Sequence, residues 1–139
     1  MEGYLTVGDM YNVREALVQS VLERMAPGFQ HKQYLVRIGT MDVFVRLLDE
    51  SREELEVQTN RLIPTLCKLM SDPNVDVREA ATNTLAHVML VFGEEISNSI
   101  QNRRLIPESK FLVMRAKVIR MTFENPERHV VRQVLNVSI

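Results

Sequence analysis

The chain has 139 residues, of which 45% are hydrophobic and 25% charged, with five glycines and five prolines. This composition is typical of a globular chain and excludes an extended disordered one. The net charge of −1 argues against general nucleic-acid binding, which depends on an excess of lysine and arginine.

The cysteine content and the length of the apolar runs indicate in which cellular compartment the chain is expected. Cys67 is the single cysteine, so the chain has no intrachain disulfide and no cysteine metal cluster, as expected in a reducing environment. No run of residues is apolar over the length needed to cross a bilayer. No signal-peptide core follows the acidic Glu2. We therefore expect a cytoplasmic protein that does not enter a membrane.

The first part of the chain has the spacing of amphipathic helices. Residues 10–25 place apolar side chains on one helical face, and Pro27-Gly28 is predicted to end this helix. After a short polar stretch at residues 30–33, a second helix is predicted over about residues 34–49.

The central part contains two further predicted helices. The highly charged stretch 50–56 is interpreted as a connection. Asn60 is predicted to cap the third helix, with Pro64 in its first turn. Asp72-Pro73-Asn74 ends this helix, and a fourth runs over about residues 75–92.

The last part begins at Gly93, which ends or bends the fourth helix. Pro107 opens a last helix, which Asn125-Pro126 closes. The tail 129–139 is rich in β-branched residues, and its pattern fits a short helix or an extended arm. Because no segment shows the alternation and hairpin turns of a sheet, the predicted fold is all-α.

The segment 62–89, LIPTLCKLMSDPNVDVREAATNTLAHVM, resembles a HEAT repeat. Ala80 and Ala81 would let two helix backbones approach closely, and Asp72 and Arg78 are predicted to pair with neighbouring repeats. The pair Val36-Arg37 echoes Val77-Arg78 at a distance of 41 residues, which fits the HEAT period of about 40–47. We therefore predict antiparallel helix pairs stacked as an α-solenoid.

A third Val-Arg pair, Val13-Arg14, does not fit this period. Arg14 precedes Arg37 by only 23 residues, which is too close for a full repeat. The pair is either a coincidence or the remnant of a shortened repeat.

A more specific resemblance covers about residues 22–121. The run GFQHKQYLVRIG over residues 28–39, the DPNVDVREAA motif, Gly93-Glu94-Glu95 and the run LIPES at residues 105–109 follow one another in order. In this order they are similar to the first TOG (tumour-overexpressed-gene) domain of the cytoplasmic linker-associated proteins, the CLASP family. The resemblance implies the C-terminal half of a TOG domain, with a helical region at 1–122 and a separate tail at 123–139.

The resemblance also implies a function. TOG domains bind αβ-tubulin through an edge built from the turns inside each repeat, and they regulate microtubule dynamics. The protein is then expected in the cytoplasm on the microtubule cytoskeleton, including the spindle. Two such turns are predicted here, at residues 29–34 and 72–76. The implied tubulin-binding candidates are His31, Lys32, Gln33, Arg37, Asn74, Val75 and Arg78.

Each candidate also has a purely structural interpretation. Lys32 and Arg37 fit solvated charges beside a turn, Asn74 fits a helix cap, and Arg78 fits a ladder between repeats. Cys67 is predicted to be a buried structural thiol. The sequence has no phosphate-binding loop, metal-ligand spacing or nucleophile motif, so we expect no cofactor, no metal and no enzymatic activity.

An alternative function is a non-catalytic interaction scaffold. A short repeat stack leaves the apolar face of its first helix uncovered, and such a face marks an interaction site. The chain would then self-associate, or dock on a partner, through Val13, Leu17 and Val21.

Overall fold

The computed structural model describes residues 6–124, which form six α-helices and one 3₁₀ turn. In chain order these are α1 (Val7–Met25), η1 (Ala26–Gln30), α2 (Tyr34–Glu50), α3 (Arg52–Leu69), α4 (Val75–Phe92), α5 (Glu94–Asn102) and α6 (Glu108–Glu124). None of the described helices is long and apolar enough to span a membrane.

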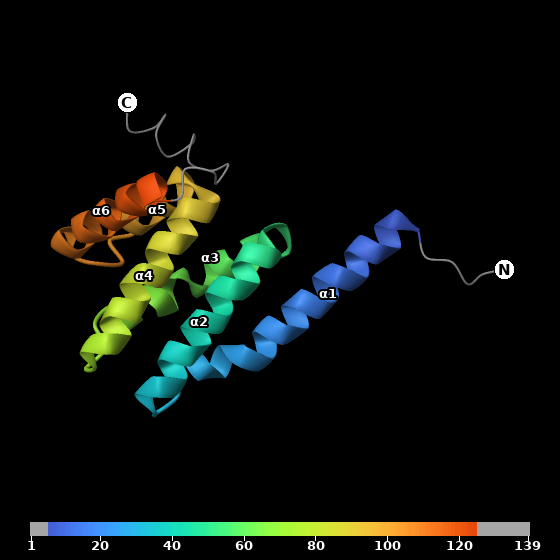
Figure 1. The fold of residues 1–139 in the computed structure, drawn as a ribbon, viewed down its shortest axis with the longest axis horizontal. Coiled ribbons are helices and arrows are strands. Elements are labelled where there is room, and N and C mark those ends of the chain that lie inside the picture. Colours follow the sequence, from blue (N-terminus) through green and yellow to red (C-terminus); the bar gives the residue numbers. More distant parts are fainter. Residues whose placement is uncertain (1–5, 125–139) are drawn as a thin grey trace.

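The helices are arranged as a repeat stack. α2 packs against α4 and α4 against α6, while α3 and α5 pack against α4 from the other side. Figure 1 shows α2 and α4 side by side, with α3 and α5 behind them. The predicted all-α fold of stacked HEAT-type helix pairs is confirmed.

The beginning of the chain departs from regular helix pairing. At this end of the stack, α2 packs against η1 rather than pairing with α1. α1 contacts α3 and η1, with Val18 and Leu22 buried and Arg14 in an ion pair with Glu54 of α3 at 2.6 Å. The first half of α1 diverges from the stack (Figure 1). α1 starts earlier than predicted because Thr6 and Asp9 form a reciprocal capping box, with both hydrogen bonds at 3.0 Å.

The expected connection at residues 50–56 is wrong. Only Ser51 separates α2 from α3, because Leu55 and Thr59 continue the buried face of the third helix and are fully buried. Glu53 and Glu54 lie in the first turn of α3, where the helix dipole stabilises negative charge. The charged stretch is therefore a helix start.

The predicted start of the third helix also falls inside α3. Asn60 does not cap the helix, and its side-chain amide donates to the carbonyl of Glu56 at 3.1 Å. Pro64 also lies within α3, where it is exposed to solvent.

An aromatic pair holds η1 against the core. Phe29 of η1 and Phe44 of α2 are buried and meet edge to face, with ring centroids 6.0 Å apart. A Cβ on Gly28 would collide with the side chain of Thr40, so the close approach of η1 to α2 requires glycine.

The structure describes the end of α4 but not the predicted end of α6. Gly93 ends α4 with a φ of 84°, and its N–H donates to Met89 at 2.8 Å, so the predicted break is confirmed. α6 is described as far as Glu124. The predicted helix end at Asn125-Pro126 and the tail up to residue 139 lie outside the described residues, so the division at residue 122 stays a prediction.

Candidate functional site

Two turns of the stack share one geometry and lie at one edge. α2 and α4 begin at Tyr34 and Val75, which are 41 residues apart, and their N-cap positions are Gln33 and Asn74. Figure 1 shows the starts of α2 and α4 at the same end of the stack. We call the surface formed by residues 31–33 and 72–75 the turn edge.

The first turn exposes its three predicted residues. His31, Lys32 and Gln33 are all exposed. The His31 Nδ1 atom accepts a hydrogen bond from the backbone N–H of Gln33 at 3.1 Å, which stabilises the turn. Within residues 6–124 the structure gives the Lys32 ammonium no hydrogen bond or ion pair, so its charge is open to a partner.

The second turn is held by its own polar side chains. Asp72 accepts from the backbone N–H of Asn74 at 2.9 Å. Asn74 in turn accepts from the N–H groups of Asp76 and Val77 at 2.8 and 3.2 Å, so it is a helix N-cap. Val75, at the tip, is 61% exposed.

An ion pair joins the two turns. The guanidinium of Arg37 lies against the carboxylate of Asp72, with Nε–Oδ2 at 3.0 Å and Nη2–Oδ1 at 3.1 Å. Its Nη1 atom also donates to the carbonyl of His31 at 2.6 Å. The predicted ladder at Asp72 is thus present, and its partner is Arg37.

Arg78 does not make the predicted bridge between repeats. Its Nη1 atom donates to the carbonyls of Asp72 and Pro73 at 2.8 and 3.1 Å, within its own turn. Arg37, Asn74 and Arg78 therefore shape the turn edge, whereas His31, Lys32, Gln33 and Val75 present exposed side chains on it.

A third turn, before α6, continues the edge and was missed as a site. The Lys110 ammonium donates to the carbonyl of Met70 at 3.0 Å and to the hydroxyl of Ser71 at 3.3 Å, which ties α6 to the second turn. Arg103 and Arg104, at the start of the connection between α5 and α6, are exposed. The signal in the sequence was the LIPES run at residues 105–109, which we used only as a family marker.

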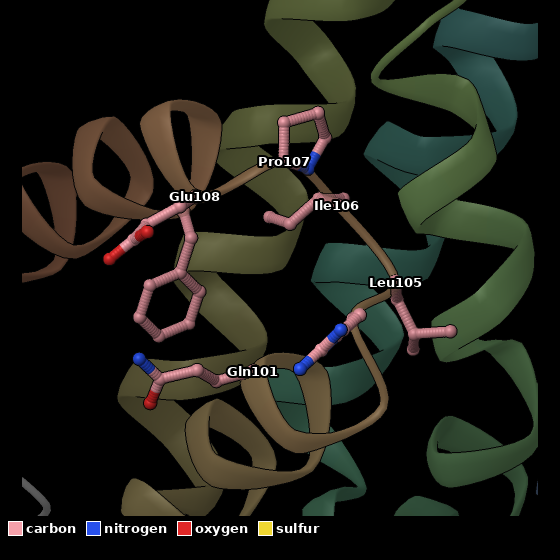
Figure 2. Close-up of a pocket in the computed structure, with 7 residues that line it drawn as sticks. Gln101, Leu105, Ile106, Pro107 and Glu108 are labelled. Carbon is pink, nitrogen blue, oxygen red and sulfur yellow. The ribbon is translucent and has the colours of Figure 1, made fainter.

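The third turn also encloses the hollow shown in Figure 2. This hollow of about 640 Å³ lies between the end of α5 and the start of α6. Gln101 and Glu108 flank it, and Ile106 and Pro107 lie along the connecting loop (Figure 2). Arg104 has a φ of 51°, so the loop passes through the left-handed region at a non-glycine residue.

The buried thiol and imidazole side chains of the core lie in surroundings typical of structural residues rather than of catalytic ones. Burial raises the pKa of the Cys67 thiol to about 11, and nearby Arg103 offsets only part of this. The thiol is therefore protonated at neutral pH, a poor state for a nucleophile. His87 is buried and lies 2.7 Å from a carboxylate oxygen of Asp49. Among the described residues, no three metal-ligating side chains cluster together.

A second surface lies far from the turn edge, on α1. Val13, Leu17 and Val21 are 48%, 62% and 48% exposed, respectively. Val13 and Leu17, together with Met10 and Leu47, border an apolar groove of about 880 Å³ between α1 and the end of α2. Groups of exposed apolar side chains of this kind mark interaction surfaces.

Comparisons with known proteins agree with this architecture. A family model for the HEAT repeat matches residues 62–92, which cover the second half of α3 and all of α4. The chain is 39% identical over 87 residues to Protein CLASP-1 of Caenorhabditis elegans, covering 63% of this chain and 6% of the relative. It is 30% identical over 115 residues to the CLIP-associating protein of Drosophila melanogaster, covering 81% of this chain and 8% of the relative.

A solved structure of a related domain is also similar to this chain. The chain resembles the crystal structure of the MAST/Orbit N-terminal domain with a TM-score of 0.66 and 28% identity. The match covers 78% of this chain and 46% of that one. The chain thus spans 6 to 8% of the length of the two curated relatives and about half of the solved domain.

Proposed function

Because this chain is a homologue of the CLIP-associating proteins, with the helix pairs of a partial TOG domain, we propose that it binds αβ-tubulin through the turn edge. It would do so as a microtubule-associated protein of the cytoplasm and spindle, and would contribute to regulating microtubule dynamics without catalysing a reaction. The observation that carries the proposal is the repeated geometry of the two turns, 41 residues apart, at one edge of the stack.

The charge on the turn edge supports the proposal. Among residues 6–124, Lys32 is exposed without a charged partner, and Arg78 donates only to neutral carbonyl oxygens. Tubulin is acidic, and complementary charge steers association and fixes orientation. Binding should accordingly weaken as salt screens the exposed charges.

The first test is sedimentation velocity of αβ-tubulin mixed with the full chain at low salt. The wild-type chain should move tubulin into a heavier complex, and Lys32→Glu should weaken that complex roughly tenfold or more, because it replaces attraction with repulsion at an exposed contact. Arg61→Glu is the matched control, since it makes the same charge change at an exposed position in the middle of α3.

The two variants distinguish binding through the turn edge from a general dependence on net charge. Loss of the complex in Lys32→Glu but not in Arg61→Glu supports the turn edge. Equal loss in both variants would show a general dependence on net charge. A wild-type chain that leaves the sedimentation of tubulin unchanged would contradict the proposed function.

A second candidate function is favoured by the exposed apolar face of α1. In this case the chain is a scaffold that associates with itself, or with a partner, through Val13, Leu17 and Val21. The two functions use different surfaces, so variants of one leave the other intact.

A further inference from the structure

A small hollow lies beside the turn edge, between the starts of α4 and α6. It has a volume of about 330 Å³ and is lined by Val75 and Val113, which are 61% and 57% exposed, with buried Met70 behind them. This volume is at the lower end of the range of small-molecule pockets. It suits a protruding side chain of another protein better than a free ligand.

Two cations border this hollow and reach the same turn from opposite helices. Arg78 of α4 donates to the carbonyls of Asp72 and Pro73, and Lys110 of α6 donates to Met70 and Ser71. All four acceptors are neutral oxygens. An ammonium has three N–H donors and a guanidinium five, so both groups keep donors for a further acceptor.

The repeat register shows why Arg78 is not paired with a carboxylate as Arg37 is. Arg37 occupies the position equivalent to Arg78, and the next turn supplies Asp72 to neutralise it. The turn that follows Arg78 has Leu105 at the position equivalent to Asp72, and it also carries the exposed Arg103 and Arg104. In the described part of the chain Arg78 has no carboxylate partner, and Glu79 is the one acidic residue that lines the hollow.

We propose that this hollow receives an apolar side chain from an acidic segment of tubulin, whose neighbouring carboxylate is bound by Lys110 and Arg78. The apolar side chain would cover Val75 and Val113, and the carboxylate would compensate the two cations. The inference rests on the proposed function and extends the turn edge to the third turn, with Val113 and Lys110 as contacts.

The test compares two adjacent residues of α6 in the full chain. Val113 lines the hollow, whereas Leu112 is similarly exposed, at 60%, but does not line it. Val113→Asp should weaken the tubulin complex roughly tenfold or more, and Leu112→Asp less than about twofold, as measured by sedimentation velocity at several tubulin concentrations. Both positions are exposed, so both variants should melt near the wild-type temperature.

A second variant tests the charge. Lys110→Gln should weaken binding and reduce its dependence on salt, because it removes one cation from the interface. Equal binding of the Val113→Asp and Leu112→Asp variants, with the wild-type chain still binding, would overturn this inference and leave the turn edge in place. A wild-type chain that binds no tubulin would overturn both.

Discussion

Arg37 and Arg78 show how equivalent residues acquire different roles. Both follow a turn by the same number of residues, and both donate to a carbonyl of that turn. The difference lies in the next repeat, which offers the carboxylate of Asp72 to Arg37, whereas the position equivalent to Asp72 before α6 is Leu105. A half-buried arginine with a carboxylate partner stabilises the stack. An arginine with only neutral partners can still pair with a carboxylate of another molecule.

The thiol of Cys67 gives a pH-dependent prediction. Burial raises its pKa from 9.0 to about 11, so the folded chain holds a proton that the unfolded chain releases above pH 9. Between pH 9 and 11 the unfolded state therefore binds fewer protons, and stability falls as pH rises. Cys67→Ala lacks this effect, although it loses buried volume at every pH.

The measurement is urea denaturation of both chains from pH 7 to pH 11. The stability advantage of the wild-type chain over Cys67→Ala should be constant below pH 9 and should shrink above it. A difference between the two chains that stays constant across this range would show that the thiol titrates normally in the folded state.

At the scale of an element, the helix starts decide how firmly the turn edge is held. The N-cap of α4 is Asn74, whose side chain accepts two backbone hydrogen bonds. The N-cap of α2 is Gln33, whose side chain makes no capping bond. The start of α2 instead depends on Arg37 and His31, so the two turns share a shape but are stabilised by different contacts.

These two N-caps form a matched pair for mutation. Asn74→Ala should lower the free energy of unfolding by about 1 kcal/mol, because two N–H groups of α4 lose their acceptor. Gln33→Ala should change it by only a few tenths of a kcal/mol, since no capping bond is lost. Chemical denaturation of both variants measures this, and equal losses would contradict the capping role of Asn74.

At the scale of the whole molecule, the stack is more open at one end. α4 is covered on both sides by α2 and α6, whereas the first half of α1 leaves the stack and exposes an apolar face. Each repeat of a solenoid buries its faces against its neighbours, so an uncovered face lacks the contact that stabilises the others. The groove beside Leu17 is where a second chain would restore that contact.

Self-association therefore has a direct test. If α1 associates with a second copy, sedimentation equilibrium of the wild-type chain should show dimers whose fraction rises with concentration. Leu17→Asp should then shift the chain to the monomer, because it places a charge in the apolar groove. Val57→Asp, at a position 60% exposed on α3, is the control and should behave as wild type. A wild-type monomer at all concentrations would exclude this second function for the isolated chain.

The sequence by itself determined the features that depend on residues close in the chain. Apolar spacing predicted the bounds of α2 and α4 to within about one residue, and the Asp72-Pro73-Asn74 break predicted the second turn. The recurrence of Val-Arg after 41 residues indicated the repeat. Helical periodicity, capping and breaks act over about four residues, so the local sequence contains them.

Only the tertiary structure decided which side chains meet and which stay exposed. The early start of α3 depends on the burial of Leu55 by neighbouring helices, which made a charged stretch helical. The Arg37–Asp72 pair and the Lys110 contacts join residues 35 to 40 positions apart. The hollow at Val113 exists only where two repeats stack. These contacts depend on how one repeat lies on the next, and that arrangement follows from packing across the whole core.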